Sequence, residues 1–100
     1  MEEYNVKISS AGKNDLMEIT EFLDTLSPEE AEQYYDSILE KTRVLAKAPE
    51  SCSFTRDSQL RLRGYRVHPV DNYIFFFVLN GKNVEIRRIL YARRQFDRVL

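Results

Sequence analysis

The spacing of apolar residues divides the chain into two parts. Residues 4–9 alternate apolar and polar side chains, which is the period-two pattern of a half-buried strand. From Ala11 to Leu26 the apolar residues recur every three or four positions, as on one face of a helix whose other side is acidic. After residue 60 the strand-like pattern returns. We therefore predict a strand and helices first, followed by a run of strands.

The segment Ser27-Pro28-Glu29-Glu30 predicts the start of a second helix. Ser27 is a favoured N-cap residue, Pro28 suits the first helical position, and Glu30 is placed to complete a capping box. The helix is expected to run to about Ala48, because Pro49 cannot continue it. Its apolar stripe comprises Ala31, Tyr34, Tyr35, Ile38, Leu39, Thr42, Leu45 and Ala46. The two helices should form a hairpin.

The second half of the chain predicts a polar loop over residues 50–59 and then three antiparallel strands joined by short turns. The expected strands are 63–68, 73–79 and 84–91, and the expected turns are 69–72 and 80–83.

The three predicted strands differ in character. The middle strand is apolar on both faces, so it should be central and covered. In the last strand the alternation slips at Arg87-Arg88, which predicts a β-bulge. Residues 93–100 are expected to form a short terminal helix or a tail.

These elements predict an α+β fold with two layers. The N-terminal strand and the helical hairpin should pack on one face of an antiparallel sheet, and the other face should carry much of the basic character. A chain of 100 residues fits a single domain, so we assign residues 1–100 to one domain.

Charge is distributed unevenly along the chain. Residues 1–60 carry 6 basic and 13 acidic side chains, whereas residues 61–100 carry 9 basic and 3 acidic ones. One interpretation is that the C-terminal half meets an anionic surface. The other is that the two halves complement each other's charge within the fold. The sequence leaves both interpretations open.

Composition excludes several kinds of site. One cysteine and one histidine make a zinc site implausible, and three scattered glycines provide no phosphate-binding loop, so neither a metal nor a cofactor is expected. No apolar run approaches the roughly 18–20 residues of a membrane span, and no signal peptide precedes the first strand. We therefore expect a cytoplasmic protein that does not contact membranes.

The remaining candidate for a binding site is an arginine-rich surface in the second half of the chain. The planar guanidinium group of arginine can form two hydrogen bonds at once to a phosphate or a carboxylate. Tyrosines 65, 73 and 91 lie among these arginines and could stack on bases, although packing in the core is the simpler expectation for each. The arginines are Arg61, Arg63, Arg66, Arg87, Arg88, Arg93, Arg94 and Arg98.

Two segments resemble the RelE/ParE family of bacterial toxins. Residues 63–77, RGYRVHPVDNYIFFF, resemble that family's basic strand, short turn and aromatic-rich strand, and residues 84–95, VEIRRILYARRQ, resemble its last strand and basic C-terminus. The preceding helical hairpin also fits. The resemblance covers nearly the whole chain, and it implies the toxin of a type II toxin–antitoxin system that arrests bacterial growth.

The resemblance implies one of two targets. The ParE-like branch poisons DNA gyrase by binding, and the RelE-like branch cleaves mRNA on the ribosome. Tyr73 stands where RelE-like nucleases carry an arginine, so the chain is closer to the ParE-like branch. If it is a nuclease, the candidate catalytic residues are Arg66, His68, Tyr91 and Arg93. A third possibility is an interaction domain without toxicity.

The resemblance also implies a cognate antitoxin that forms a hetero-oligomer with the toxin, through an acidic amphipathic segment. The expected antitoxin-binding residues are Phe22, Leu23, Tyr34, Tyr35, Arg87 and Arg88. The expected target-binding residues are Arg61, Arg63, Arg66, Tyr73, Arg87, Arg88, Arg93 and Arg94. For Arg87 and Arg88 the alternative is internal pairing with the acidic helices.

Overall fold

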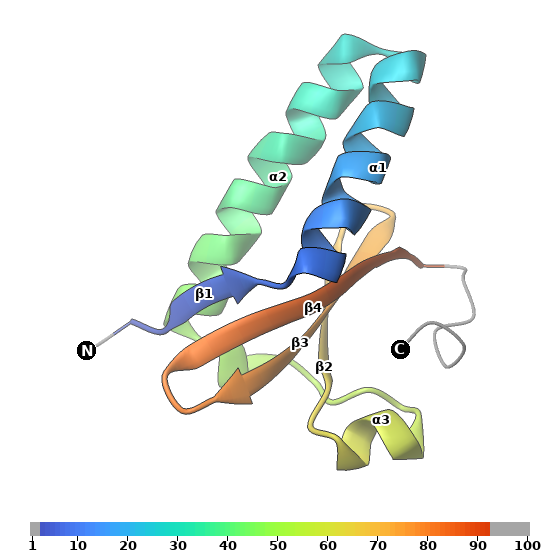
Figure 1. Cartoon of the computed structure of the whole chain (residues 1–100). Helices are drawn as coiled ribbons and strands as arrows, with labels where there is room; N and C mark the ends of the chain where they lie inside the picture. Colours follow the sequence, from blue (N-terminus) through green and yellow to red (C-terminus); the bar gives the residue numbers. More distant parts are fainter. Residues whose placement is uncertain (1–2, 93–100) are drawn as a thin grey trace.

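A four-stranded sheet forms one layer of the computed structural model, which describes residues 3–92 (Figure 1). Its strands lie in the order β1-β4-β3-β2, where the bounds are β1 Asn5–Ile8, β2 Arg66–Val70, β3 Tyr73–Asn80 and β4 Asn83–Tyr91. Strands β2, β3 and β4 are antiparallel, as predicted. The N-terminal strand was expected to pack on a face of this sheet, but β1 is instead its fourth strand and lies parallel to β4 at one edge, which makes the sheet mixed. The predicted terminal helix or tail falls outside the described residues.

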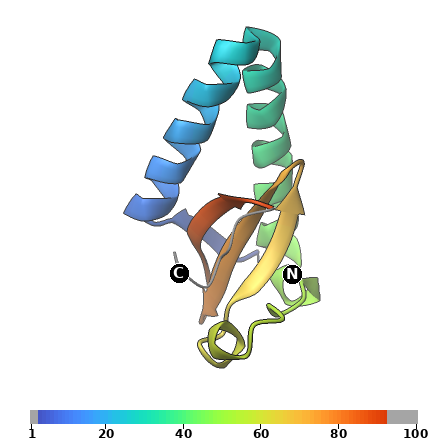
Figure 2. The same cartoon turned by 90° about the vertical axis from the view of Figure 1, so that its right-hand side faces the viewer.

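The second layer is a hairpin of two helices, α1 (Ser10–Leu26) and α2 (Pro28–Lys47), which covers one face of the sheet and projects beyond it (Figure 2). Ser27 caps α2 by accepting a hydrogen bond from the Glu30 N–H at 3.4 Å, and Pro28 occupies the first turn. The two-layer α+β fold is therefore confirmed, and so is the end of α2 just before Pro49.

One detail of the α2 cap was predicted wrongly. The Ser27 hydroxyl donates to the Glu29 carboxylate at 2.7 Å, and Glu30 contributes only its backbone N–H. The Ser27 N–H, which a capping box would have used, already donates to the Leu23 carbonyl at 2.9 Å. The tight connection between the helices therefore leaves no donor for a capping-box carboxylate.

The segment before β2 also differs from the prediction of a loop followed by a strand at Arg63. It contains a 3-10 turn, η1 (Pro49–Ser51), and a short helix, α3 (Ser58–Leu62), and β2 begins only at Arg66. Asp57 caps α3 by accepting from the Leu60 N–H at 3.0 Å, and Gly64 then takes a φ of 84° that turns the chain toward β2. A helix of five residues is too short to show a helical period in the sequence.

The sheet separates two hydrophobic clusters. The larger lies between the sheet and the hairpin and includes Phe75 and Phe77, whereas Phe76 belongs to a second cluster on the opposite face. Strand β3 is therefore central and covered on both sides, as predicted. The opposite face, which was expected to carry much of the basic character, is covered by Leu60 of α3 and by Tyr65, which pack against apolar side chains of the sheet, and the arginines around α3 lie outside this cluster.

The predicted β-bulge is confirmed in β4. Phe76 pairs with Arg88 and Phe77 pairs with Ile86, so Arg87 is the extra residue. The Ser9 hydroxyl donates to the Arg87 carbonyl at 2.8 Å and accepts from the Gly12 N–H at 3.0 Å. One serine therefore both caps α1 and binds the bulge.

A buried ion pair joins α1 to the same part of β4. Asp15, which is 8% exposed, accepts from Arg88 Nε at 2.7 Å and from Arg88 Nη2 at 2.9 Å. Its Oδ2 atom also accepts from the Ile89 N–H at 2.9 Å. For Arg88, this is the internal pairing with an acidic helix that the sequence left open.

We predict that Asp15→Ala lowers the free energy of unfolding by about 2–4 kcal/mol, because it leaves a largely buried guanidinium and a buried backbone N–H without this acceptor. Asp15→Asn should cost less, since its amide oxygen can still accept one of these bonds. Urea denaturation followed by circular dichroism measures both changes.

The matched control is Glu85→Ala, which removes the partner of the neighbouring Arg87. That pair is solvent-exposed, with the Arg87 side chain 43% exposed, so its loss should change stability little. Equal effects of Asp15→Ala and Glu85→Ala would show that the ion pair to α1 has no special part in stability.

Candidate functional site

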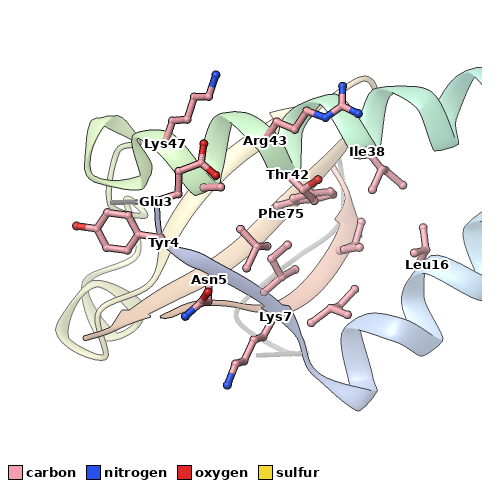
Figure 3. A pocket seen from close by; sticks show the side chains of 15 residues that line it. Glu3, Tyr4, Asn5, Lys7, Leu16, Ile38, Thr42, Arg43, Lys47 and Phe75 are labelled. Atoms are coloured by element: carbon pink, nitrogen blue, oxygen red, sulfur yellow. The ribbon is translucent and has the colours of Figure 1, made fainter. Parts of the chain in front are cut away.

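An open groove of about 760 Å³ lies between the two helices and β1 (Figure 3). Its floor is formed by side chains of the sheet, among them Phe75, Ile86 and Ile89, and these belong to the main hydrophobic cluster. Leu16 of α1 and Ile38 of α2 form part of its walls. The groove therefore gives access from the surface to the apolar interior.

The groove exists because the helices diverge from their junction at Ser27 toward the sheet (Figures 1 and 2). The start of α1 sits directly on the strands: a Cβ atom at Gly12 would lie only 2.9 Å from Ile8 Cγ1 and 3.2 Å from the Ile86 carbonyl oxygen. The end of α2 is held separately, by a 2.7 Å hydrogen bond from the Tyr4 N–H to the Ala46 carbonyl. Strand β1 crosses the open end between them.

An apolar stripe of α2 continues the groove along the hairpin. Tyr35, Leu39, Thr42 and Ala46 follow one another at intervals of four, three and four residues and so share one side of the helix. Thr42 and Ala46 line the groove, whereas Leu39 is 56% exposed and Tyr35 is 48% exposed. From Tyr35 to Ala46 the stripe spans eleven intervals, or about 16 Å at about 1.5 Å per residue. It is long enough to receive a helix of about three turns.

The rim of the groove is positively charged. Three cationic residues line it, Lys7, Arg43 and Lys47, against one carboxylate, Glu3 (Figure 3). All four are exposed. An acidic ligand would therefore be attracted to this opening.

Strand β1 adds hydrogen-bonding capacity to the groove. It is an edge strand, and its Asn5 N–H donates toward β4, to the Lys82 carbonyl at 2.8 Å. Within residues 3–92, no strand pairs with its outer side. A free edge of this kind can accept an added strand.

The residues expected to bind an antitoxin lie in different environments. Tyr34 is only 3% exposed and packs against Tyr73 with ring centroids 5.1 Å apart, and Leu23 is half-buried against the core. Phe22 is 56% exposed but does not line the groove. Tyr35 lies on the groove stripe. Leu39 was not among the expected contacts, although it belongs to the apolar stripe that the sequence predicts for α2.

Three of the expected target-binding arginines hold the loop around α3. The Arg66 guanidinium donates to the Cys52 carbonyl at 2.7 Å and lies 3.9 Å from the centroid of the Phe54 ring. Arg61 donates from Nε to the Thr55 carbonyl at 3.1 Å. Arg63 lies over the Tyr65 ring at 5.2 Å. These contacts give the arginines a structural part whatever else they bind.

The other expected target-binding residues that the structure describes lie on β3 and β4. Arg87 pairs with Glu85 at 2.7 Å and Arg88 pairs with Asp15, both at the bulge of β4. Tyr73 starts β3, with its ring between those of Tyr34 and Tyr91. Arg93 and Arg94 lie outside the described residues. The structure therefore gathers Arg61, Arg63 and Arg66 around α3, and Tyr65, whose ring Arg63 covers, also interacts with Arg87.

The candidate catalytic residues are not gathered at one point. His68 lies on the helix-facing side of β2, with Nδ1 3.5 Å from Cys52 Sγ, and its Nε2 atom is buried without a hydrogen-bond partner. Burial and the charge of Lys41 hold the pKa of His68 below its usual value, so the ring is neutral near pH 7. Tyr91 lies across β3, where it packs against Tyr73 at 5.7 Å. Arg93 falls outside the described residues.

Residues 3–92 contain neither a metal-binding cluster nor a membrane-spanning helix. No three His, Cys, Asp or Glu side chains gather in a way that could hold a metal ion. No helix in this range combines the length and the apolar character needed to cross a bilayer.

Comparison with known proteins identifies the family. A family model described as the ParE toxin of a type II toxin-antitoxin system, parDE, matches residues 6–96. No curated protein matches the sequence. Among solved structures, a chain of the chromosomal ParDE TA system from P. aeruginosa is similar, with a TM-score of 0.74 and 20% identity over 90% of this chain and 97% of that chain. The chain belongs to the ParE toxin family of type II toxin–antitoxin systems.

Proposed function

We propose that this ParE-family toxin arrests bacterial growth by binding and poisoning DNA gyrase, and that a cognate antitoxin neutralises it by occupying the groove. Membership of the ParE toxin family over residues 6–96 carries the first part of the proposal. The apolar groove with its positively charged rim carries the second.

The positions of the candidate catalytic residues support a toxin that acts by binding. Cleavage of RNA needs a base, an acid and a cation around one phosphate. Here Arg66 donates to the carbonyls of Cys52 and Glu50. The Nε2 atom of His68 is buried without a hydrogen-bond partner and the pKa of the ring is lowered, while Tyr91 lies two strands away on β4. Arg66 and His68 therefore serve the fold, whereas a nuclease would need them at one phosphate together with Tyr91.

The groove supports an antitoxin segment that is amphipathic and acidic. Its apolar side would cover Leu39, Thr42 and Ala46, and its carboxylates would face the cationic rim. Burial of apolar surface supplies most of the affinity in such an interface, whereas the charges chiefly raise the association rate. The segment would fold as it binds.

We predict that the purified protein inhibits the supercoiling activity of gyrase and that induction of the chain alone arrests bacterial growth. The measurement is a supercoiling assay with increasing toxin, read together with trapped cleavage complexes. Toxin premixed with its antitoxin is the control and should leave gyrase active.

Two results would contradict the gyrase proposal. Codon-phased cuts in mRNA from expressing cells, with gyrase unaffected, would identify a ribosome-dependent nuclease. Normal growth of cells that accumulate the folded protein would identify an interaction domain without toxicity.

We predict that Leu39→Glu weakens antitoxin binding at least tenfold, which is about 1.4 kcal/mol, because it removes apolar contact and adds a charge that repels an acidic segment. Isothermal titration calorimetry with the cognate antitoxin measures the change. Phe22→Glu is the matched control, since Phe22 has the same exposed fraction of 56% but lies on α1, away from the α2 stripe that continues the groove. A loss confined to Phe22→Glu would place the antitoxin elsewhere on the hairpin.

We predict that acid destabilises the protein through His68. Its pKa is lowered in the folded state, so below about pH 6.5 the unfolded chain takes up a proton that the folded chain resists, and stability falls as the pH drops. His68→Phe should flatten this fall in urea denaturation measured between pH 7.5 and 5.5, and should still arrest growth. A folded His68→Phe protein that no longer arrests growth would give His68 a functional role.

A further inference from the structure

Helix α3 carries an apolar side chain that the fold does not use. Leu60 faces the second hydrophobic cluster and is 5% exposed, whereas Leu62 points away from it and is 88% exposed. Among the large hydrophobic side chains of residues 3–92, Leu62 has the highest exposed fraction. Figures 1 and 2 show α3 at the end of the domain away from the tip of the hairpin.

The surroundings of Leu62 are cationic. Residues 54–66 contain four arginines and one acidic residue, Asp57, whose carboxylate caps α3 by accepting from the Leu60 N–H. Arg61 and Arg63 are exposed on either side of Leu62 in the chain, and Arg56 is exposed in the segment before α3. We call the set Phe54, Arg56, Arg61, Leu62 and Arg63 the α3 surface.

The α3 surface is held in a defined shape before anything binds to it. The Thr55 N–H donates to the Tyr65 carbonyl and the Val67 N–H donates to the Ser53 carbonyl, each at 3.0 Å, so the segment before α3 is tied to the start of β2. Arg61 is tied to the Thr55 carbonyl by its Nε atom. A surface that is already ordered loses little conformational entropy on binding.

We propose that the α3 surface docks onto an acidic patch of the toxin's protein target, with Leu62 inserted in an apolar recess at the centre of the contact. The inference rests on the proposed function, because it takes the target to be a protein. Arginine is enriched at the energetic centres of protein interfaces, and an exposed apolar side chain gains free energy when a recess removes it from water. DNA and RNA offer phosphates for the arginines, but they receive a leucine only where base steps are unstacked at a cost in free energy, so the composition favours a protein.

The α3 surface is distinct from the antitoxin groove. Leu60 anchors α3 to the cluster on the face of the sheet opposite the hairpin, and no residue of the α3 surface lines the groove. A variant at Leu62 can therefore separate target binding from antitoxin binding. It can also be expected to fold, since the side chain contributes little buried area.

The test compares Leu62→Glu with the wild-type toxin and with Leu26→Glu, a change at an exposed leucine of the hairpin tip that is 60% exposed. For Leu62→Glu we expect the toxin concentration that half-inhibits gyrase to rise at least about tenfold and growth arrest to be lost. Antitoxin affinity and melting temperature should stay at the wild-type values. Leu26→Glu should inhibit like the wild type.

Three outcomes would overturn the inference. In the first, Leu62→Glu inhibits gyrase as strongly as the wild type does. In the second, Leu62→Glu weakens antitoxin binding, which would show that the antitoxin binds the α3 surface. Alternatively, the wild type could bind a fluorescent DNA duplex through Arg61, with loss in Arg61→Glu and no effect of Leu62→Glu. If the wild type arrests growth without inhibiting gyrase, the gyrase proposal fails by itself, and the effect of Leu62→Glu on growth arrest decides the α3 inference.

Discussion

The ion pair between Asp15 and Arg88 determines how the two layers meet. β1 pairs with β4 only as far as Ile86, and the bulge at Arg87 follows at once. Beyond that point α1 takes the place of a neighbouring strand: Ser9 binds the bulge carbonyl, and Asp15 binds both the Arg88 guanidinium and the Ile89 N–H. Polar groups that an exposed edge would leave to water are thus satisfied by a helix. The start of α1 is thereby anchored on β4.

This anchor has a consequence for binding. With α1 seated on β4 and the end of α2 attached to the start of β1, the helices cannot lie side by side along their whole length. They separate toward the sheet and leave the groove over Phe75 and Ile89. A domain of this size can leave such apolar surface open if a partner covers it for much of its life. The opposite face is closed by α3, which keeps its single protruding leucine outside the core.

The arginines show how far residue type alone can assign a role. The sequence correctly indicates a cluster of guanidinium groups in the second half, but it cannot tell which of them the fold uses. Arg66 donates to two backbone carbonyls and Arg88 holds a buried carboxylate, so both are structural elements. The arginine side chain reaches far enough to find partners distant in the sequence, as the sequence separation of 73 between Asp15 and Arg88 illustrates. Only the folded chain distinguishes an arginine engaged internally from one presented to a ligand.

Features that depend on neighbouring residues could be predicted from the sequence: the serine and proline at the start of α2, the turn with Gly81 at a φ of 61°, the doubly covered β3 and the bulge in β4. Each follows from backbone geometry or from a local period of apolar residues. The sequence could not predict three other features: the parallel pairing of β1 with β4, the position of α3 and the groove. These depend on which surfaces, distant in the sequence, meet in the folded chain. Tyr35 was therefore predictable as a residue of an apolar stripe, whereas the exposure of Leu39 and Leu62 was decided by tertiary packing alone.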